Sequence, residues 1–203
     1  MVNTHIIRRT IFALLATWLV AGSMVTGQYQ VQQSVNNKLN TLNSSNLEIQ
    51  RSLDQLLLRH SRITRRVREA LSLESPFERD SVLAWAVDGY ARAMEAGNAD
   101  VSMALQSAQS QSDSQQLTLD LDRFALQLDR LQGLADKVET TLGELVPTQQ
   151  TESPRSWPEA TASFHRSDNG WTAALNTAKA TLTLAMAREQ TRVGNQTLLK
   201  FPK

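Results

Sequence analysis

Apolar residues recur every seven positions along the first part of the chain, with a second set interleaved between them. Such a repeat is typical of a helix that packs one apolar seam against partner helices. The two sets are Val35, Leu42, Ile49, Leu56, Ile63 and Ala70, and Leu39, Asn46, Leu53, His60 and Val67. The pattern predicts a coiled-coil helix of about five heptads. Its partner helix must come from the same chain or from a second copy.

Two members of the second set, Asn46 and His60, are polar. Polar residues in a seam can fix the register or the number of helices at some cost in stability. Both residues are therefore candidates for setting the oligomeric register. The alternative is that they are tolerated because they face a wet groove.

Breaks in the pattern indicate where this helix ends and the next one turns. Ser75-Pro76 disfavours continuing the first helix beyond about Ser72, and Pro76 suits the first turn of a second helix. In that helix Gly97-Asn98 looks like a stop signal, but a turn there would leave two helices too unequal to pack side by side. We therefore expect one kinked helix that turns in the polar stretch 110–114.

A second heptad repeat follows, in which every seam position is apolar. Its members are Leu117, Phe124, Leu131, Val138 and Leu145, interleaved with Leu121, Leu128, Ala135 and Leu142. Outside the seam, Asp122, Asp129 and Asp136 form one column, and Arg123, Arg130 and Lys137 form its neighbour. Charged columns of this kind are typical of the solvent-exposed back of a bundle helix.

The last helical segment opens near Ser156 and Pro158, after a loop rich in Pro, Ser, Thr and Gln that begins at Pro147. Its seam residues are Phe164, Trp171, Ala178 and Ala185, with Leu175 and Leu182 between them. Asp168-Asn169-Gly170 interrupts the run, so we expect either two helices or one helix with a bulge. The pattern predicts fraying beyond Arg192.

One uncharged apolar run, from Ile11 to Gly27, follows Arg8 and Arg9 near the N-terminus. A helix over this run is about 25 Å long, slightly shorter than a ~30 Å hydrocarbon core. The run fits an uncleaved anchor with the two Arg residues on the cytoplasmic side, and it also fits a cleaved signal peptide. Both alternatives place the rest of the chain across a bacterial inner membrane, in the periplasm.

These signals give an all-α fold, with an N-terminal transmembrane or signal helix followed by an elongated up-down bundle. The expected divisions are a cytoplasmic tail over 1–9, the apolar segment over 10–27, the bundle over 28–194 and a tail over 195–203. Composition agrees, because the chain is 41% hydrophobic with only 8 Gly and 5 Pro. Ala, Leu, Gln and Arg are also helix-favouring residues.

Composition also limits the chemistry that we expect. The net charge of +1 gives no global electrostatic case for nucleic acid, and the absence of Cys excludes disulfides and thiolate sites. His5, His60 and His165 show no metal-binding spacing, although His165 and Asp168 are close enough in sequence to form an ion pair. Since no phosphate-binding Gly loop or nucleophile motif is present, we expect no enzyme activity, cofactor or metal.

One cluster of like charges stands out on the first helix. It consists of Arg59, Arg62, Arg65, Arg66 and Arg68. Helical spacing places Arg59, Arg62 and Arg66 along one face. Guanidinium groups suit carboxylates and phosphates, so the cluster is a candidate anion-binding or partner-binding site. The alternative is a solvated helix end, where cations favour the helix dipole and pair with nearby Glu residues.

A short N-terminal tail, one apolar span, a long first helix carrying clustered Arg and three further helices resemble a known architecture. It is the periplasmic four-helix-bundle sensory domain of bacterial chemoreceptors and related histidine kinases. In that family, arginines on the first long helix help bind carboxylate ligands at a dimer interface. The resemblance thus points to Arg59, Arg62 and Arg66. No second apolar span or cytoplasmic signalling module is evident, so only a ligand-binding or partner-binding bundle carries over.

Two functional hypotheses follow. The first is a non-enzymatic, membrane-tethered adaptor that binds an anionic ligand or an envelope partner protein through the Arg cluster. The second is a self-associating coiled-coil scaffold or spacer of the cell envelope, for which Asn46 and His60 would set the oligomeric state.

Overall fold

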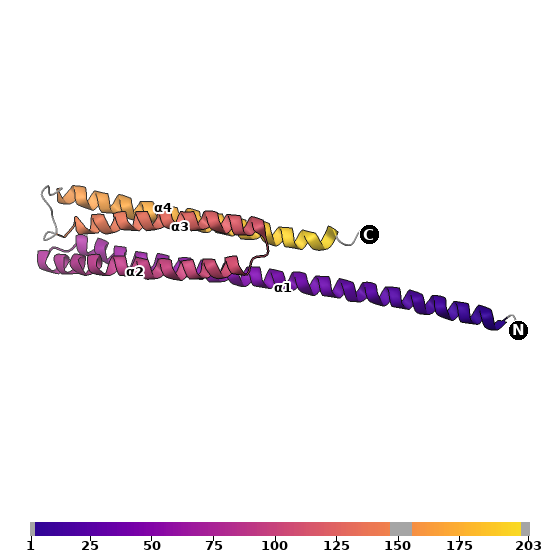
Figure 1. Ribbon diagram of the computed structural model, residues 1–203. Coiled ribbons are helices and arrows are strands. Elements are labelled where there is room, and N and C mark those ends of the chain that lie inside the picture. The colour runs from indigo at the N-terminus through magenta and orange to yellow at the C-terminus, as the bar shows by residue number, and fades with distance from the viewer. Residues whose placement is uncertain (1–2, 147–155, 200–203) are drawn as a thin grey trace. The chain divides into compact units, whose positions relative to one another are not determined.

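The computed structural model describes residues 3–146 and 156–199, and all of its regular elements are helices (Figure 1). They are α1 (Asn3–Leu71), α2 (Pro76–Ser110), α3 (Gln115–Gly143) and α4 (Trp157–Leu199). The chain divides into two compact units, one made of Leu42–Glu189 and the other of Met1–Thr41 with Gln190–Lys203. These are packing units, and they leave untested both the predicted membrane boundaries at residues 9 and 27 and the predicted end of the bundle at residue 194.

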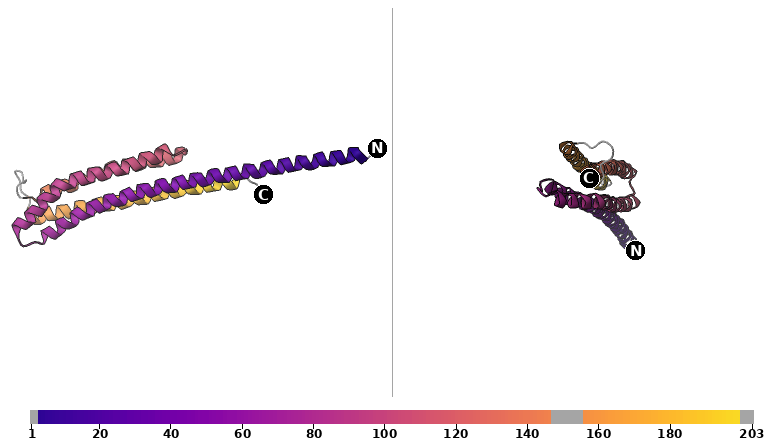
Figure 2. Two further views of the ribbon diagram at one scale, coloured as in Figure 1. Left: turned by 90° about the horizontal axis from the view of Figure 1, so that it is seen from below. Right: turned by 90° about the vertical axis from the view of Figure 1, so that its left-hand side faces the viewer.

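The unit Leu42–Glu189 is an up-down bundle of four helices. The residue pairs that meet across neighbouring helices show the directions. On α1 and α2, His60 meets Tyr90 and Arg59 meets Asp100, so the residue number rises on one helix as it falls on the other. The same opposed order joins α1 to α4 and α2 to α3. Figures 1 and 2 show these helix segments running alongside one another. The predicted fold class is thus confirmed for this unit.

Local capping explains where these helices begin. The Ser75 side chain accepts a hydrogen bond from the Glu78 backbone N–H, directly before Pro76. Ser114 does the same for the Leu117 N–H at the start of α3. At the start of α4, Glu159 accepts a bond of 3.2 Å from the Ser156 N–H. Each bond satisfies a backbone donor that the first helical turn leaves unpaired.

The predicted seams form the core of the bundle. All nine predicted seam residues of the second heptad repeat are buried, eight within α3 and Leu145 in the turn just after it, and so are the six predicted seam residues of α4. On α1 the seam is buried from Ile49 onward, whereas Asn46 is half-buried and accepts a hydrogen bond of 3.2 Å from Gln50 Nε2. The charged columns on the back of α3 are exposed, as the sequence predicts.

Two ambiguous breaks in the sequence are resolved in favour of continuous helices. α2 passes through Gly97 without interruption and ends at Ser110, which confirms the predicted turn over 110–114. Gly97 is buried against α1, where an added Cβ would lie 2.5 Å from Leu56 Cδ1. The glycine therefore permits close helix packing. α4 also continues through Gly170 and extends to Leu199, beyond the predicted fraying point at Arg192.

The second unit contains the remaining parts of α1 and α4. Its described apolar side chains on α1 include Trp18, Leu19 and Val25, which are exposed. Within the part of the chain that the structure describes, no helix has both the length and the apolar character needed to cross a membrane. The side chains of residues 1–16, 20–24 and 196–199 lie outside the described part, as do residues 147–155 of the predicted loop and the tail residues 200–203. The anchor and the signal peptide remain predictions.

Candidate functional site

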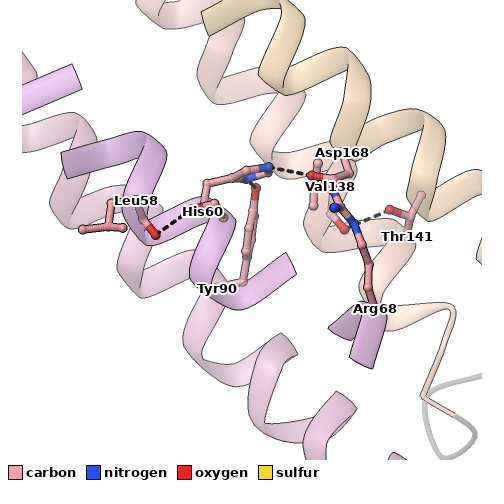
Figure 3. A network of polar contacts seen from close by, with 8 residues as sticks. Leu58, His60, Arg68, Tyr90, Val138, Thr141 and Asp168 are labelled. Carbon is pink, nitrogen blue, oxygen red and sulfur yellow. Dashed lines mark hydrogen bonds and ion pairs between the residues drawn. The ribbon is translucent and has the colours of Figure 1, made fainter. Parts of the chain in front are cut away.

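A layer of polar side chains crosses the core of the bundle at the level of His60. His60 comes from α1, Tyr90 from α2, and Asp168 and Trp171 from α4. The first three are only 1% exposed, and Trp171 is fully buried. Figure 3 shows the imidazole between the Tyr90 hydroxyl and the Asp168 carboxylate, with Arg68 on the far side of the carboxylate. We call these five residues the polar layer.

The hydrogen bonds of the polar layer form one continuous chain. His60 Nδ1 lies 2.8 Å from the Tyr90 hydroxyl, and His60 Nε2 lies 2.8 Å from Asp168 Oδ1. The other carboxylate oxygen, Oδ2, pairs with Arg68 Nη2. A carboxylate only accepts, so Nε2 carries a proton and donates to it. In the neutral imidazole Nδ1 then accepts, and the Tyr90 hydroxyl donates to it.

The protein environment acts on both acidic groups of the layer. Burial by itself raises the pKa of Asp168, but hydrogen bonds from His60 and Arg68 outweigh burial and hold that pKa below its ordinary value. Burial, reinforced by the negative charge of Asp168, raises the pKa of Tyr90. At neutral pH the layer thus contains an ionised carboxylate and a neutral phenol, with Arg68 as the compensating cation.

Trp171 completes the layer by stacking on His60. The two rings lie 3.8 Å apart between centroids, with an angle of 22° between their planes. Within the described residues, the buried Trp171 Nε1 has no hydrogen-bond partner. The ring therefore contributes packing and orientation to the layer, and its N–H group is left unsatisfied at some energetic cost.

The polar layer aligns helices and offers little access for chemistry. Tyr, His and Asp in a hydrogen-bonded row can move a proton, but a reacting molecule would have to reach groups that are almost fully buried. Among the described residues, no three His, Asp or Glu side chains are grouped so that they could hold a metal ion. His60, predicted as an oligomer-register residue, has partners from its own chain, and its effect on oligomeric state stays untested.

The predicted Arg cluster divides into two groups in the structure. Arg59 pairs with Asp100 at 2.8 Å, and Arg68 pairs with Asp168, so these two guanidinium groups already bind carboxylates of the same chain. The remaining three, Arg62, Arg65 and Arg66, are exposed. Of these, Arg65 lies 3.2 Å from Glu69, an exposed pair that is weak in water.

A groove lies beside the exposed arginines, where the end of α1 meets the start of α2. It encloses about 560 Å³. Its lining consists of Arg66, Glu69, Ala70, Leu73, Ser81, Val82 and Trp85. The Arg66 guanidinium carbon lies 4.9 Å from the centre of the Trp85 ring, a cation–π contact. We call this feature the Arg66–Trp85 groove.

Sequence reasoning missed two important features of these sites. It considered Asp168 only beside His165, its neighbour in sequence, whereas the structure pairs Asp168 with His60 on another helix. A signal was present, because Asp168 lies seven residues before Leu175 in the α4 seam. Trp85 gave no such signal, since its contact with Arg66 depends on how α1 and α2 pack.

Comparison with known proteins found no match to this chain among family models, curated proteins or solved structures. Of the resemblance to a chemoreceptor sensory domain, the structure bears out only an all-helical, up-down bundle of long helices.

Proposed function

We propose that this protein is a non-enzymatic helical-bundle adaptor that binds an acidic segment of a partner protein in the Arg66–Trp85 groove. The observation that carries the proposal is the guanidinium of Arg66 held against Trp85 at the edge of an apolar groove. A guanidinium that lies over an aromatic ring keeps N–H groups directed away from the ring, where they can bind a carboxylate.

The surroundings of the groove favour an acidic occupant with an apolar side chain. Arg62 and Arg66 are exposed one helical turn apart, so two carboxylates on a partner helix could meet them at matching spacing. Ala70, Leu73 and Val82 supply apolar surface beside them. Because Glu69 is already paired with Arg65, the nearest negative charge is partly neutralised. A basic partner would instead face repulsion from the guanidinium groups of Arg62 and Arg66.

The location of this adaptor follows from the apolar segment 10–27. Its Arg-flanked apolar run supports export to the bacterial inner membrane, with the bundle in the periplasm. The partner is accordingly an envelope protein that presents an acidic, amphipathic segment.

Binding can be tested with a synthetic amphipathic peptide in which Glu and Leu alternate at helical spacing, titrated into the full chain by calorimetry. The Arg62→Gln, Arg66→Gln double variant should weaken binding at least tenfold, because both charge-assisted contacts are lost. A matched control, Arg123→Gln with Arg130→Gln, changes two exposed arginines on the back of α3 and should leave binding unchanged.

A groove variant and a control peptide show whether binding takes place in the Arg66–Trp85 groove. Trp85→Leu should weaken peptide binding while leaving helicity unchanged, because Trp85 is 45% exposed and lies outside the core. A Lys-Leu peptide of the same pattern should not bind. Equal affinity of the double variant and the wild type, or equal binding of both peptides, would contradict the proposal.

A further inference from the structure

The outer face of α1 carries a second seven-residue pattern, distinct from the buried seam. It consists of Leu47, Asp54 and Ser61 at one set of positions and Ser44, Arg51 and Leu58 at the other. All six residues are exposed, on the side of α1 that faces away from the bundle core. Leu47 and Leu58 are 59% and 56% exposed, and they lie about three helical turns apart on this face.

A shallow hollow of about 310 Å³ marks the middle of this face. Leu47 and Leu58 lie at its two ends, with Arg51 and Asp54 between them. Asp54 also pairs with Lys179 of α4 through one oxygen, and its side chain remains 62% exposed. The second carboxylate oxygen is therefore accessible from outside the bundle. We call this surface the outer seam.

The order of residues along the outer seam is nearly the same in both directions. Read from either end, it gives Ser, Leu, a charged residue, a charged residue of opposite sign, Leu and Ser. In an antiparallel coiled coil each position of one set lies opposite a position of the other set on the partner helix. Two copies of this helix would place Leu47 opposite Leu58, Arg51 opposite Asp54, and Ser44 opposite Ser61.

We propose that the outer seam of α1 is an interface at which two copies of this chain pair in antiparallel orientation. Charge complementarity favours a second copy of the chain as the partner and favours the antiparallel orientation. The antiparallel pair forms two Arg51–Asp54 contacts, one on each side of the two-fold axis, between two leucine layers. A parallel pair would place Arg51 against Arg51 and Asp54 against Asp54, which is repulsive at both layers.

Cysteine crosslinking tests the pairing directly, because the chain contains no Cys of its own. The Leu47→Cys, Leu58→Cys double variant of the full chain should form a disulfide-linked dimer under mild oxidation with diamide. Each single variant should not, because identical positions lie about 16 Å apart in the antiparallel pair, too far for a disulfide. The matched control, Leu119→Cys with Leu126→Cys, places two exposed leucines of α3 outside the interface and should stay monomeric.

Charge substitutions provide an independent readout by sedimentation equilibrium of the full chain. Arg51→Asp should weaken self-association at least tenfold, because it places two carboxylates opposite each other at both charged layers. Adding Asp54→Arg should restore association. Arg130→Asp, a matched change on the back of α3, should have no effect.

The outcomes separate the alternatives. Efficient crosslinking of either single cysteine variant would replace the antiparallel pair with a parallel one. Absence of crosslinking in the double variant, or unchanged association of Arg51→Asp, would overturn the interface altogether. None of these results depends on the Arg66–Trp85 groove, so the proposed partner binding would stand or fall separately.

Discussion

The α3 seam and the polar layer belong to the same bundle, but they stabilise it by different chemistry. The α3 seam buries eight apolar residues along the helix and Leu145 just beyond its end, each contributing through the area that it removes from water. The polar layer buries an imidazole, a phenol and a carboxylate that satisfy one another in a single geometry. Apolar contacts are non-directional and tolerate sliding by a heptad, whereas the hydrogen bonds of the layer exist in one register only. The apolar seam therefore stabilises the bundle in any heptad register, whereas the polar layer stabilises a single register of the helices.

Removing one member of the layer should have the largest effect on stability. We expect Asp168→Ala to lower the free energy of unfolding by about 3 kcal/mol, because the buried His60 N–H loses its acceptor and Arg68 its counter-charge. Urea unfolding followed by circular dichroism measures this change. As a matched control, Asp129→Ala on the exposed back of α3 should change the free energy by less than about 0.5 kcal/mol. Similar losses in the two variants would show that the layer does not stabilise the fold.

Acid should remove part of the same contribution. Because the folded state lowers the pKa of Asp168 from its ordinary value of 3.8, the carboxylate stabilises the fold above that value. The stabilisation is lost as the pH falls through the lower, folded-state pKa. The difference in unfolding free energy between wild type and Asp168→Asn should therefore be largest near neutral pH and shrink below about pH 4. A difference that stays constant down to acid pH would contradict the assigned ionisation.

Replacing the three buried, hydrogen-bonded members of the polar layer together should change the free energy of unfolding least. The triple variant His60→Leu, Tyr90→Phe, Asp168→Leu removes every buried hydrogen-bonding partner together, and we expect its stability to lie within about 1 kcal/mol of wild type or above it. We expect its helix register to be less uniquely defined, visible as faster amide exchange along α4 and a weaker near-ultraviolet dichroism signal. A triple variant as well ordered as wild type would show that apolar packing alone sets the register.

The fold could be predicted from the sequence to a large extent, and the candidate sites only in part. Heptad spacing locates the seams because burial repeats with the helix, and Pro76 and the polar stretch 110–114 locate two turns by local backbone preference. The bonds of His60 could not be located in this way. They join residues 30 and 108 positions apart, and local pattern does not specify which helices are neighbours.

The Arg cluster illustrates the same limit. Its spacing on α1 is readable from the sequence, but the neutralisation of Arg59 by Asp100 depends on the packing of α2 against α1. The burial of Asp168, which engages Arg68, depends in turn on the position of α4. Sequence reasoning identified a group of five equivalent cations. The structure distinguishes Arg59 and Arg68, which pair with carboxylates on other helices, from Arg65, which pairs with Glu69 on its own helix, and from the exposed Arg62 and Arg66.

The stacking of Trp171 on His60 has an optical consequence. An indole in a dry core emits at short wavelength, and a neighbouring imidazole quenches that emission more strongly once it is protonated. Trp18 and Trp85 are exposed and Trp157 is half-buried beside Arg79, so the emission of all three lies at longer wavelength than that of the fully buried Trp171. The short-wavelength edge of the protein's fluorescence therefore reports on the centre of the bundle, and the chain carries a native probe of its polar layer that needs no label.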